Sequence, residues 1–177
     1  MRRHLEAVFF GKEAAGLKIQ IGIASQMLKL LDERGEAIKE YAISSSKNGV
    51  GEKIGSFRTP RGRHMIRAKI GGGMPVNTVF VKRRPTGETY SKELSLQFPD
   101  RDWILTRILW LSGMEPGFNR WREVDTMRRY IYIHGAPDGT EMGKPGSHGC
   151  IRMRNDDLVE LFEQVETGTE VEIIESL

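Results

Sequence analysis

The chain has 177 residues, which is enough for one domain with a core that needs neither disulfides nor metal. Charged residues make up 29% and the formal net charge is +3, so we expect a soluble globular protein whose scattered cations do not favour nucleic-acid binding. The single cysteine excludes an intrachain disulfide.

Residues 1–16 are predicted to be an N-terminal extension, followed by a single domain over 17–177. The extension begins with two arginines, but its apolar run, 7–10, spans only four residues. A secretory signal needs about 7–15 apolar residues and a membrane-spanning helix needs about 20. We therefore expect no membrane span and a cytoplasmic location, or a periplasmic one if a signal peptide has been removed.

The first part of the chain predicts β-strands and one long loop. Residues 17–23 alternate between apolar and polar side chains, and residues 26–31 and 36–44 continue as an antiparallel meander. Residues 48–62 contain four glycines and a proline, which indicates a long loop of the kind that often carries function. A further strand is predicted at 63–70.

The middle of the chain is more varied. Residues 71–102 mix Gly, Pro, Ser and charged residues around a short strand at 78–81, which predicts an excursion or lid. The apolar segment 103–111 favours a core strand, with a short helix as the competing interpretation. Residues 128–135 are predicted to form a strand that ends on glycine.

One helix is predicted near the C-terminus. Asn155 is expected to cap it, and its apolar residues follow the helical spacing i, i+3, i+4, i+7: Leu158, Leu161, Phe162 and Val165. Residues 169–174 form the last predicted strand. The fold is therefore expected to be mainly β (α+β), a β-sandwich or barrel-like domain.

The stretch 147–155, SHGCIRMRN, contains the only cysteine. A thiol attacks as its thiolate, so Cys150 needs a neighbouring base, and His148 and His134 are the candidates. His134 lies at a predicted strand end, on the same face as Tyr132, and the Gly135 carbonyl can orient its second ring nitrogen.

The neighbours of Cys150 suggest further roles. Gly149 permits a positive φ that would aim the N–H groups of Gly149 and Cys150 at one point, which is the requirement of an oxyanion hole. Arg152 suits a substrate carboxylate, and Asn155 is either a helix cap or a substrate contact.

Two other interpretations of Cys150 stay open. It can be a small buried hydrophobe, or it can bind zinc with His134 and His148. The sequence offers no second cysteine and no nearby carboxylate ligand, so neither a metal nor any other cofactor is predicted. His64 is expected to be a surface or hydrogen-bonded histidine rather than a ligand.

These residues resemble the signature of the L,D-transpeptidase catalytic domain, the YkuD-like family. The signature has an upstream His, then Ser or Thr, His, Gly and Cys, an apolar residue, Arg and, a little later, Asn. It is matched by His134, the segment 147–152 and Asn155, and a second landmark, T-P-x-G, is matched at 59–62. The resemblance covers residues 17–175.

The resemblance implies a mostly β catalytic domain in which Cys150 is the nucleophile and His134 the base. It also implies that the Gly135 carbonyl orients His134, that His148 supports the site, and that the substrates are peptidoglycan stem peptides. Four residues are assigned to substrate binding: Arg152, Ser147, Tyr132 and Asn155. Carbapenems are expected to acylate Cys150.

The leading hypothesis is an L,D-carboxypeptidase that releases terminal D-Ala from tetrapeptides during muropeptide recycling. An L,D-transpeptidase that cross-links peptidoglycan is the alternative, and it differs only in having an amine instead of water as acyl acceptor. A non-catalytic muropeptide-binding or regulatory domain is the hypothesis from another class. The intact His134, Gly149 and Cys150 disfavour that third hypothesis, because binding needs no thiol.

Overall fold

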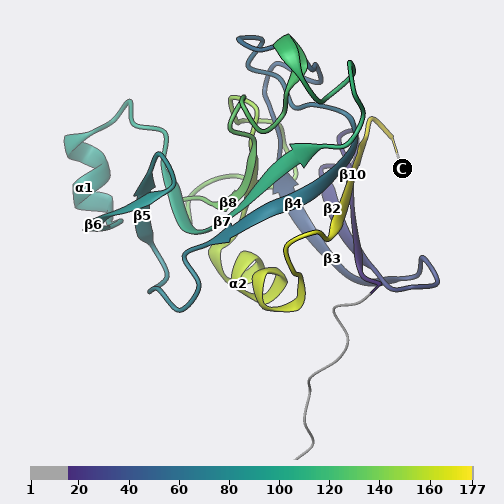
Figure 1. Cartoon of the computed structure of the whole chain (residues 1–177). Helices are drawn as coiled ribbons and strands as arrows, with labels where there is room; N and C mark the ends of the chain where they lie inside the picture. The colour runs from purple at the N-terminus through teal and green to yellow at the C-terminus, as the bar shows by residue number, and fades with distance from the viewer. Residues whose placement is uncertain (1–15, 177) are drawn as a thin grey trace, which may run out of the picture.

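The computed structural model describes residues 16–176 and contains one ten-stranded sheet that closes on itself (Figure 1). The strand order is β4-β10-β1-β2-β3-β9-β8-β7-β5-β6, and β4 also pairs with β7. That additional pairing closes a barrel and leaves β5 and β6 outside it. The mainly β, barrel-like prediction is therefore confirmed.

Most of the predicted strands are present, with shifts of a few residues at their ends. The strands are β1 (Lys18–Gly22), β2 (Met27–Leu31), β3 (Ala37–Ser44), β4 (Gly62–Ile70), β5 (Thr78–Val81), β6 (Arg84–Thr89), β7 (Ile104–Gly113), β8 (Tyr132–Gly135), β9 (Ile151–Met153) and β10 (Glu170–Ile174). The helices are α1 (Lys92–Gln97), the 3-10 turn η1 (Arg122–Val124) and α2 (Asn155–Gln164).

The predicted meander forms because its apolar residues alternate toward one core. β2 pairs antiparallel with both β1 and β3, and Ile19 and Ile21 of β1 are almost fully buried. Burying each such side chain contributes on the order of 2 kcal/mol. β1 also pairs in parallel with β10, so the first and last strands meet in the barrel wall.

The segment 71–102 contains more structure than its sequence indicated. Beside β5 it holds β6 and α1, which extend from one side of the barrel at the left of Figure 1. β6 is almost entirely exposed, so its sequence has no alternating apolar pattern from which a strand could be predicted. The Ser91 side chain caps α1 by accepting a hydrogen bond from the Leu94 N–H. Segment 103–111 is a strand, β7, as predicted.

Strand β8 begins at Tyr132, not at residue 128 as predicted. Residues 126–130 instead form a turn on Asp125, whose side chain accepts a hydrogen bond from the Arg128 N–H and whose carbonyl accepts one from the Arg129 N–H. Tyr130 has a positive φ of 56°, which ends any extended run before β8.

Helix α2 packs its predicted apolar residues into the main core, where Leu158, Leu161 and Phe162 are buried. The prediction that Asn155 caps this helix is wrong. Arg154 occupies the capping position without a side-chain hydrogen bond, and the Asn155 side chain is turned into the protein. Its partners are described with the site.

The predicted extension, residues 1–16, falls almost wholly outside the described residues, so the division of the chain at residue 17 stays a prediction. Within residues 16–176, none of the helices is both long enough and apolar enough to cross a membrane.

Candidate active site

Parallel pairing of β8 with β9 gathers the candidate residues on one face of the sheet. Ile133 lies opposite Ile151 and His134 opposite Arg152, so Cys150 lies beside Tyr132, one step earlier. Because side chains alternate along a strand, the even-numbered residues share a face while the isoleucines fill the core. The Tyr132 N–H lies 3.3 Å from Cys150 Sγ, which confirms that the two strands meet there.

His134 is held in its neutral form. It is almost fully buried, and its Nδ1 lies 2.7 Å from the Gly135 carbonyl, as the sequence predicted. A carbonyl accepts only, so Nδ1 carries the hydrogen and Nε2 is left with its lone pair. Burial lowers the pKa of His134, which keeps the imidazole uncharged.

The Gly135 carbonyl is itself fixed by a buried network. A Cβ at Gly135 would lie 2.3 Å from Asn155 Oδ1 and 2.7 Å from the Leu105 carbonyl, so only glycine fits. The Asn155 amide donates to the Ala136 carbonyl at 3.0 Å, and its Oδ1 accepts from the Thr106 hydroxyl. Asn155 thus supports the strand end that orients His134.

Thr106 gives this network an unusual backbone. It has a φ of +74°, which is strained for a β-branched residue, and lies in a bulge of β7 opposite Gly135. Its hydroxyl also accepts a hydrogen bond from the Asn77 N–H, so the bulge ties the β5 region to the site. The Asn155 amide groups have partners within the protein, and a direct substrate contact by Asn155 stays a prediction.

Cys150 rests as a thiol. Burial raises its pKa to about 12, and Sγ lies 3.4 Å from the Tyr130 carbonyl, which can accept the thiol hydrogen. With His134 neutral, the pair is an uncharged thiol and imidazole before any substrate binds. A thiol in this state can act as a nucleophile only if a base removes its proton during the attack.

The turn before Cys150 is built from three short polar contacts. Gly149 has the predicted positive φ, +135°, and its N–H donates to the Ser147 hydroxyl at 3.2 Å. That hydroxyl in turn donates to the Cys150 carbonyl, and buried Thr59 donates to the Gly149 carbonyl at 2.9 Å. Thr59 belongs to the T-P-x-G landmark, whose contribution is therefore to hold this turn.

These contacts bear on two predicted roles. In this conformation the Gly149 N–H already has a partner, so it is not free to serve the oxyanion hole together with the Cys150 N–H. The Ser147 hydroxyl likewise serves the turn. Both roles stay predictions, and the oxyanion role of Gly149 requires the substrate to displace Ser147.

Asp102 is a site residue that the sequence analysis missed. Its carboxylate lies 2.8 Å from Arg152 and 3.7 Å from His148. Burial acts to raise the pKa of Asp102, but the neighbouring His134, Arg152 and His148 hold it below its usual value. Arg152 also donates to the Gly146 carbonyl, so two of its five N–H groups are used. Asp102 carries no local signal, because only folding brings it to β9.

A cavity of about 550 Å³ opens over Cys150. Lys82 and Arg83 from the β5–β6 hairpin line it, together with Tyr130, Tyr132 and other residues of the site.

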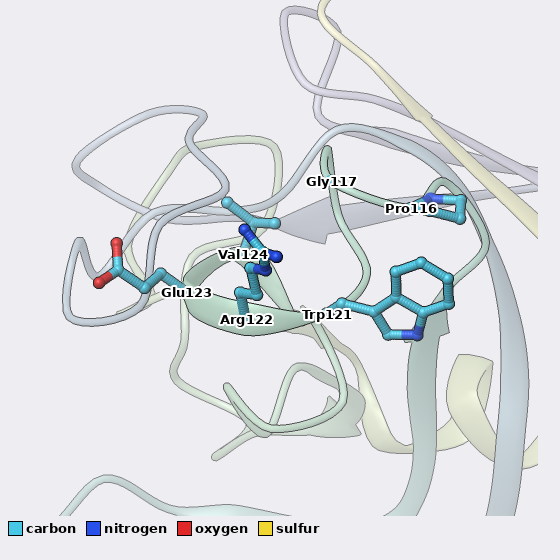
Figure 2. A pocket seen from close by; sticks show the side chains of 6 residues that line it. All are labelled: Pro116, Gly117, Trp121, Arg122, Glu123 and Val124. Atoms are coloured by element: carbon cyan, nitrogen blue, oxygen red, sulfur yellow. The ribbon is translucent and has the colours of Figure 1, made fainter.

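A separate hollow of about 720 Å³, shown in Figure 2, is lined by Pro116, Gly117, Trp121, Arg122, Glu123 and Val124. It shares no lining residue with the cavity over Cys150. Within residues 16–176, no cluster of three or more His, Cys, Asp or Glu side chains has a geometry that could hold a metal ion.

Comparison with known proteins places these residues in a family context. Residues 17–173 match the YkuD family, described as the L,D-transpeptidase catalytic domain. Over 47 residues the chain is 45% identical to the probable L,D-transpeptidase YbiS of Escherichia coli and 47% identical to the probable L,D-transpeptidase ErfK/SrfK of Salmonella typhimurium. Each match covers 27% of this chain and only 15% of the relative's length.

The fold has solved counterparts. The structure of the LD transpeptidase LdtMt1 in complex with imipenem superposes with a TM-score of 0.54 and 19% identity, covering 90% of this chain and 59% of that one. At this identity the likeness concerns the fold, whereas the family match rests on sequence over almost the whole described chain. The chain therefore belongs to the L,D-transpeptidase catalytic domain family, YkuD, whose members are cysteine acyl-transfer enzymes.

Proposed function

We propose that this chain is a cysteine-dependent L,D-carboxypeptidase that removes the terminal D-Ala from peptidoglycan tetrapeptides. The observation that carries the proposal is the neutral pair of Cys150 and His134, with His134 Nδ1 bound to the Gly135 carbonyl and Nε2 left as base. Such a pair performs acyl transfer through a thioester.

The proposed reaction begins when the Cys150 sulfur attacks the scissile carbonyl carbon and His134 Nε2 takes the thiol proton. A carbon–sulfur bond forms, and the carbonyl electron pair moves onto oxygen. When this intermediate collapses, the carbon–nitrogen bond breaks and the imidazolium returns its proton to the departing D-Ala amine. The acyl group is then held as a thioester on Cys150.

Water completes the cycle. His134 takes a proton from the water as its oxygen attacks the thioester carbon, the carbon–sulfur bond breaks, and the imidazolium reprotonates Cys150. The products are a tripeptide and D-Ala. Recycled muropeptides in the cytoplasm would be the natural substrates, and localisation of the full-length tagged protein tests that part of the proposal.

An L,D-transpeptidase activity is the second candidate, and it is favoured by the names of the relatives. It uses the same thioester and differs in the acceptor, which would be the amine of a second stem peptide. Incubation with a disaccharide-tetrapeptide, followed by mass spectrometry, separates the two. Release of D-Ala with tripeptide supports the carboxypeptidase, whereas a cross-linked dimer supports the transpeptidase.

Two controls address the chemistry itself. Cys150→Ala should abolish either activity, and retained turnover would refute the assignment of the nucleophile. The LdtMt1 structure contains imipenem, and we propose that carbapenems likewise acylate Cys150 here. Intact mass should increase by one carbapenem in the wild type and not in Cys150→Ala. A protein that binds muropeptides without turnover would instead support the non-catalytic hypothesis.

A further inference from the structure

We propose that Arg83, at the turn of the β5–β6 hairpin, binds a carboxylate of the substrate and makes the enzyme selective for substrates that carry it. This inference rests on the proposed function for its substrate but on the structure for its chemistry. The cavity over Cys150 is lined by one lysine and two arginines, Lys82, Arg83 and Arg129, and by a single carboxylate, Asp102.

The other cations of the site are already engaged. Arg152 pairs with Asp102 at 2.8 Å. Arg129 donates to the carbonyls of Gly51 and Glu52 at 3.0 and 2.9 Å, so it ties down the loop before β4. Neither Lys82 nor Arg83 forms an ion pair within residues 16–176. A positive charge without a counter-ion therefore faces the cavity that holds Cys150.

Arg83 is held in a defined position by aromatic rings. Its guanidinium carbon lies 4.4 Å from the centre of the Trp110 ring and 4.9 Å from that of Tyr130. One guanidinium N–H donates to the Tyr132 hydroxyl at 3.0 Å. Of the five N–H groups of an arginine, most are left for a ligand, and the rings reduce the entropy lost when a carboxylate binds.

The backbone of the turn is consistent with a functional role. Val81 pairs directly with Arg84, so Lys82 and Arg83 alone form the turn, and both have positive φ, 48° and 67°. Two-residue turns of this kind favour Asn-Gly, and side chains larger than these cost on the order of 1 kcal/mol each. The chain instead places Lys82 and Arg83 there, two of the cations that line the cavity over Cys150, and Arg83 reaches the Tyr132 hydroxyl.

A stem peptide offers more than one carboxylate of this chemistry, notably that of the terminal D-Ala and that of the diamino acid side chain. The test therefore compares a tetrapeptide with two analogues, each with one of these carboxylates converted to the amide. The wild type should lose about 10- to 100-fold in kcat/KM on amidation of the recognised carboxylate. Arg83→Gln should show a similar loss in kcat/KM with the unmodified tetrapeptide. Amidation of the recognised carboxylate should then cause no further loss in this variant.

Arg84→Gln is the matched control, because Arg84 is the next residue of the same hairpin, is exposed and does not line the cavity. It should behave as wild type, and Arg83→Lys should retain part of the selectivity. Equal losses by Arg83→Gln on all three substrates, or no loss on any, would overturn the proposal.

A second measurement does not depend on peptidoglycan chemistry. Iodoacetate and iodoacetamide alkylate the same thiol, but only iodoacetate carries a carboxylate. The rate of alkylation of Cys150 by iodoacetate, divided by the rate with iodoacetamide, should fall several-fold in Arg83→Gln, because the variant no longer attracts the carboxylate. The same ratio should be unchanged in Arg84→Gln. If the wild type cleaves no tetrapeptide but this ratio falls as expected, the proposed function fails and the carboxylate site stands. If tetrapeptide is cleaved and the ratio is unchanged, Arg83 is not a carboxylate site.

Discussion

Acidification from pH 6.5 to 4.5 should destabilise this protein, and buried His64 should account for a measurable part of the loss. This β4 residue is fully buried; its Nδ1 lies 3.0 Å from the Gly62 carbonyl and its Nε2 lies 3.0 Å from the Thr126 hydroxyl. It thereby joins the barrel wall to the loop that leads to Tyr130. Burial lowers the pKa of His64 to about 4, against about 6.5 in an unfolded chain.

The sign and size follow from proton linkage. A histidine with a lowered folded pKa contributes no penalty above pH 6.5, where it is neutral in both states. Below that pH the unfolded chain binds a proton that the folded one excludes, so stability falls as pH falls toward 4. The slope approaches about 1.4 kcal/mol per pH unit only well below pH 6.5, so the two units together cost about 2 kcal/mol of unfolding free energy, a large share of the usual 5–15 kcal/mol.

Urea unfolding followed by tryptophan fluorescence at several pH values between 7 and 4.5 measures this loss. The comparison is His64→Asn, which keeps a donor toward the Gly62 carbonyl but does not titrate. The variant should be less stable at pH 7 yet lose about 2 kcal/mol less than wild type on acidification. Buried His134, whose pKa is also lowered, makes the unfolding free energy fall with pH to the same extent in both proteins, so it cancels in the comparison. Parallel curves for the two proteins would refute the reasoning.

Three further outcomes are expected. Alkylation of Cys150 by iodoacetamide should keep rising with pH beyond pH 9, because burial raises the thiol pKa to about 12; a plateau near pH 7 would indicate a preformed thiolate. Asn155→Ala should lower the unfolding free energy by about 2 kcal/mol in urea titrations and lower kcat more than it raises KM, since it frees the strand end at Gly135. Asp102→Asn should lower kcat/KM about tenfold, because Arg152 loses the partner that positions it, and should make the rate more sensitive to salt, because the site gains net positive charge toward an anionic substrate; an unchanged salt dependence would contradict this role.

Much of the barrel could be predicted from local patterns. The alternation in β1 and the spacing of Leu158, Leu161 and Phe162 in α2 each identify which face of an element is apolar, and burial of that face decides its structure. β6 could not be found in this way, because it is exposed and is formed only by pairing with β5. Asn155 was assigned to a cap because caps favour asparagine, whereas the tertiary structure uses its amide inside the protein.

The sequence by itself determined which reactive groups come together: a short motif and a strand end predicted Cys150, two candidate histidines and the Gly135 carbonyl in one neighbourhood, and the structure shows His134 bound to that carbonyl. Only the tertiary structure decided the electrostatics around them. Asp102 neutralises Arg152, and Arg83 arrives from a hairpin outside the barrel, through contacts between segments far apart in the chain. Side-chain periodicity shows which face of a helix or strand is buried. Which charged side chains become neighbours depends instead on how the closed sheet brings distant strands together.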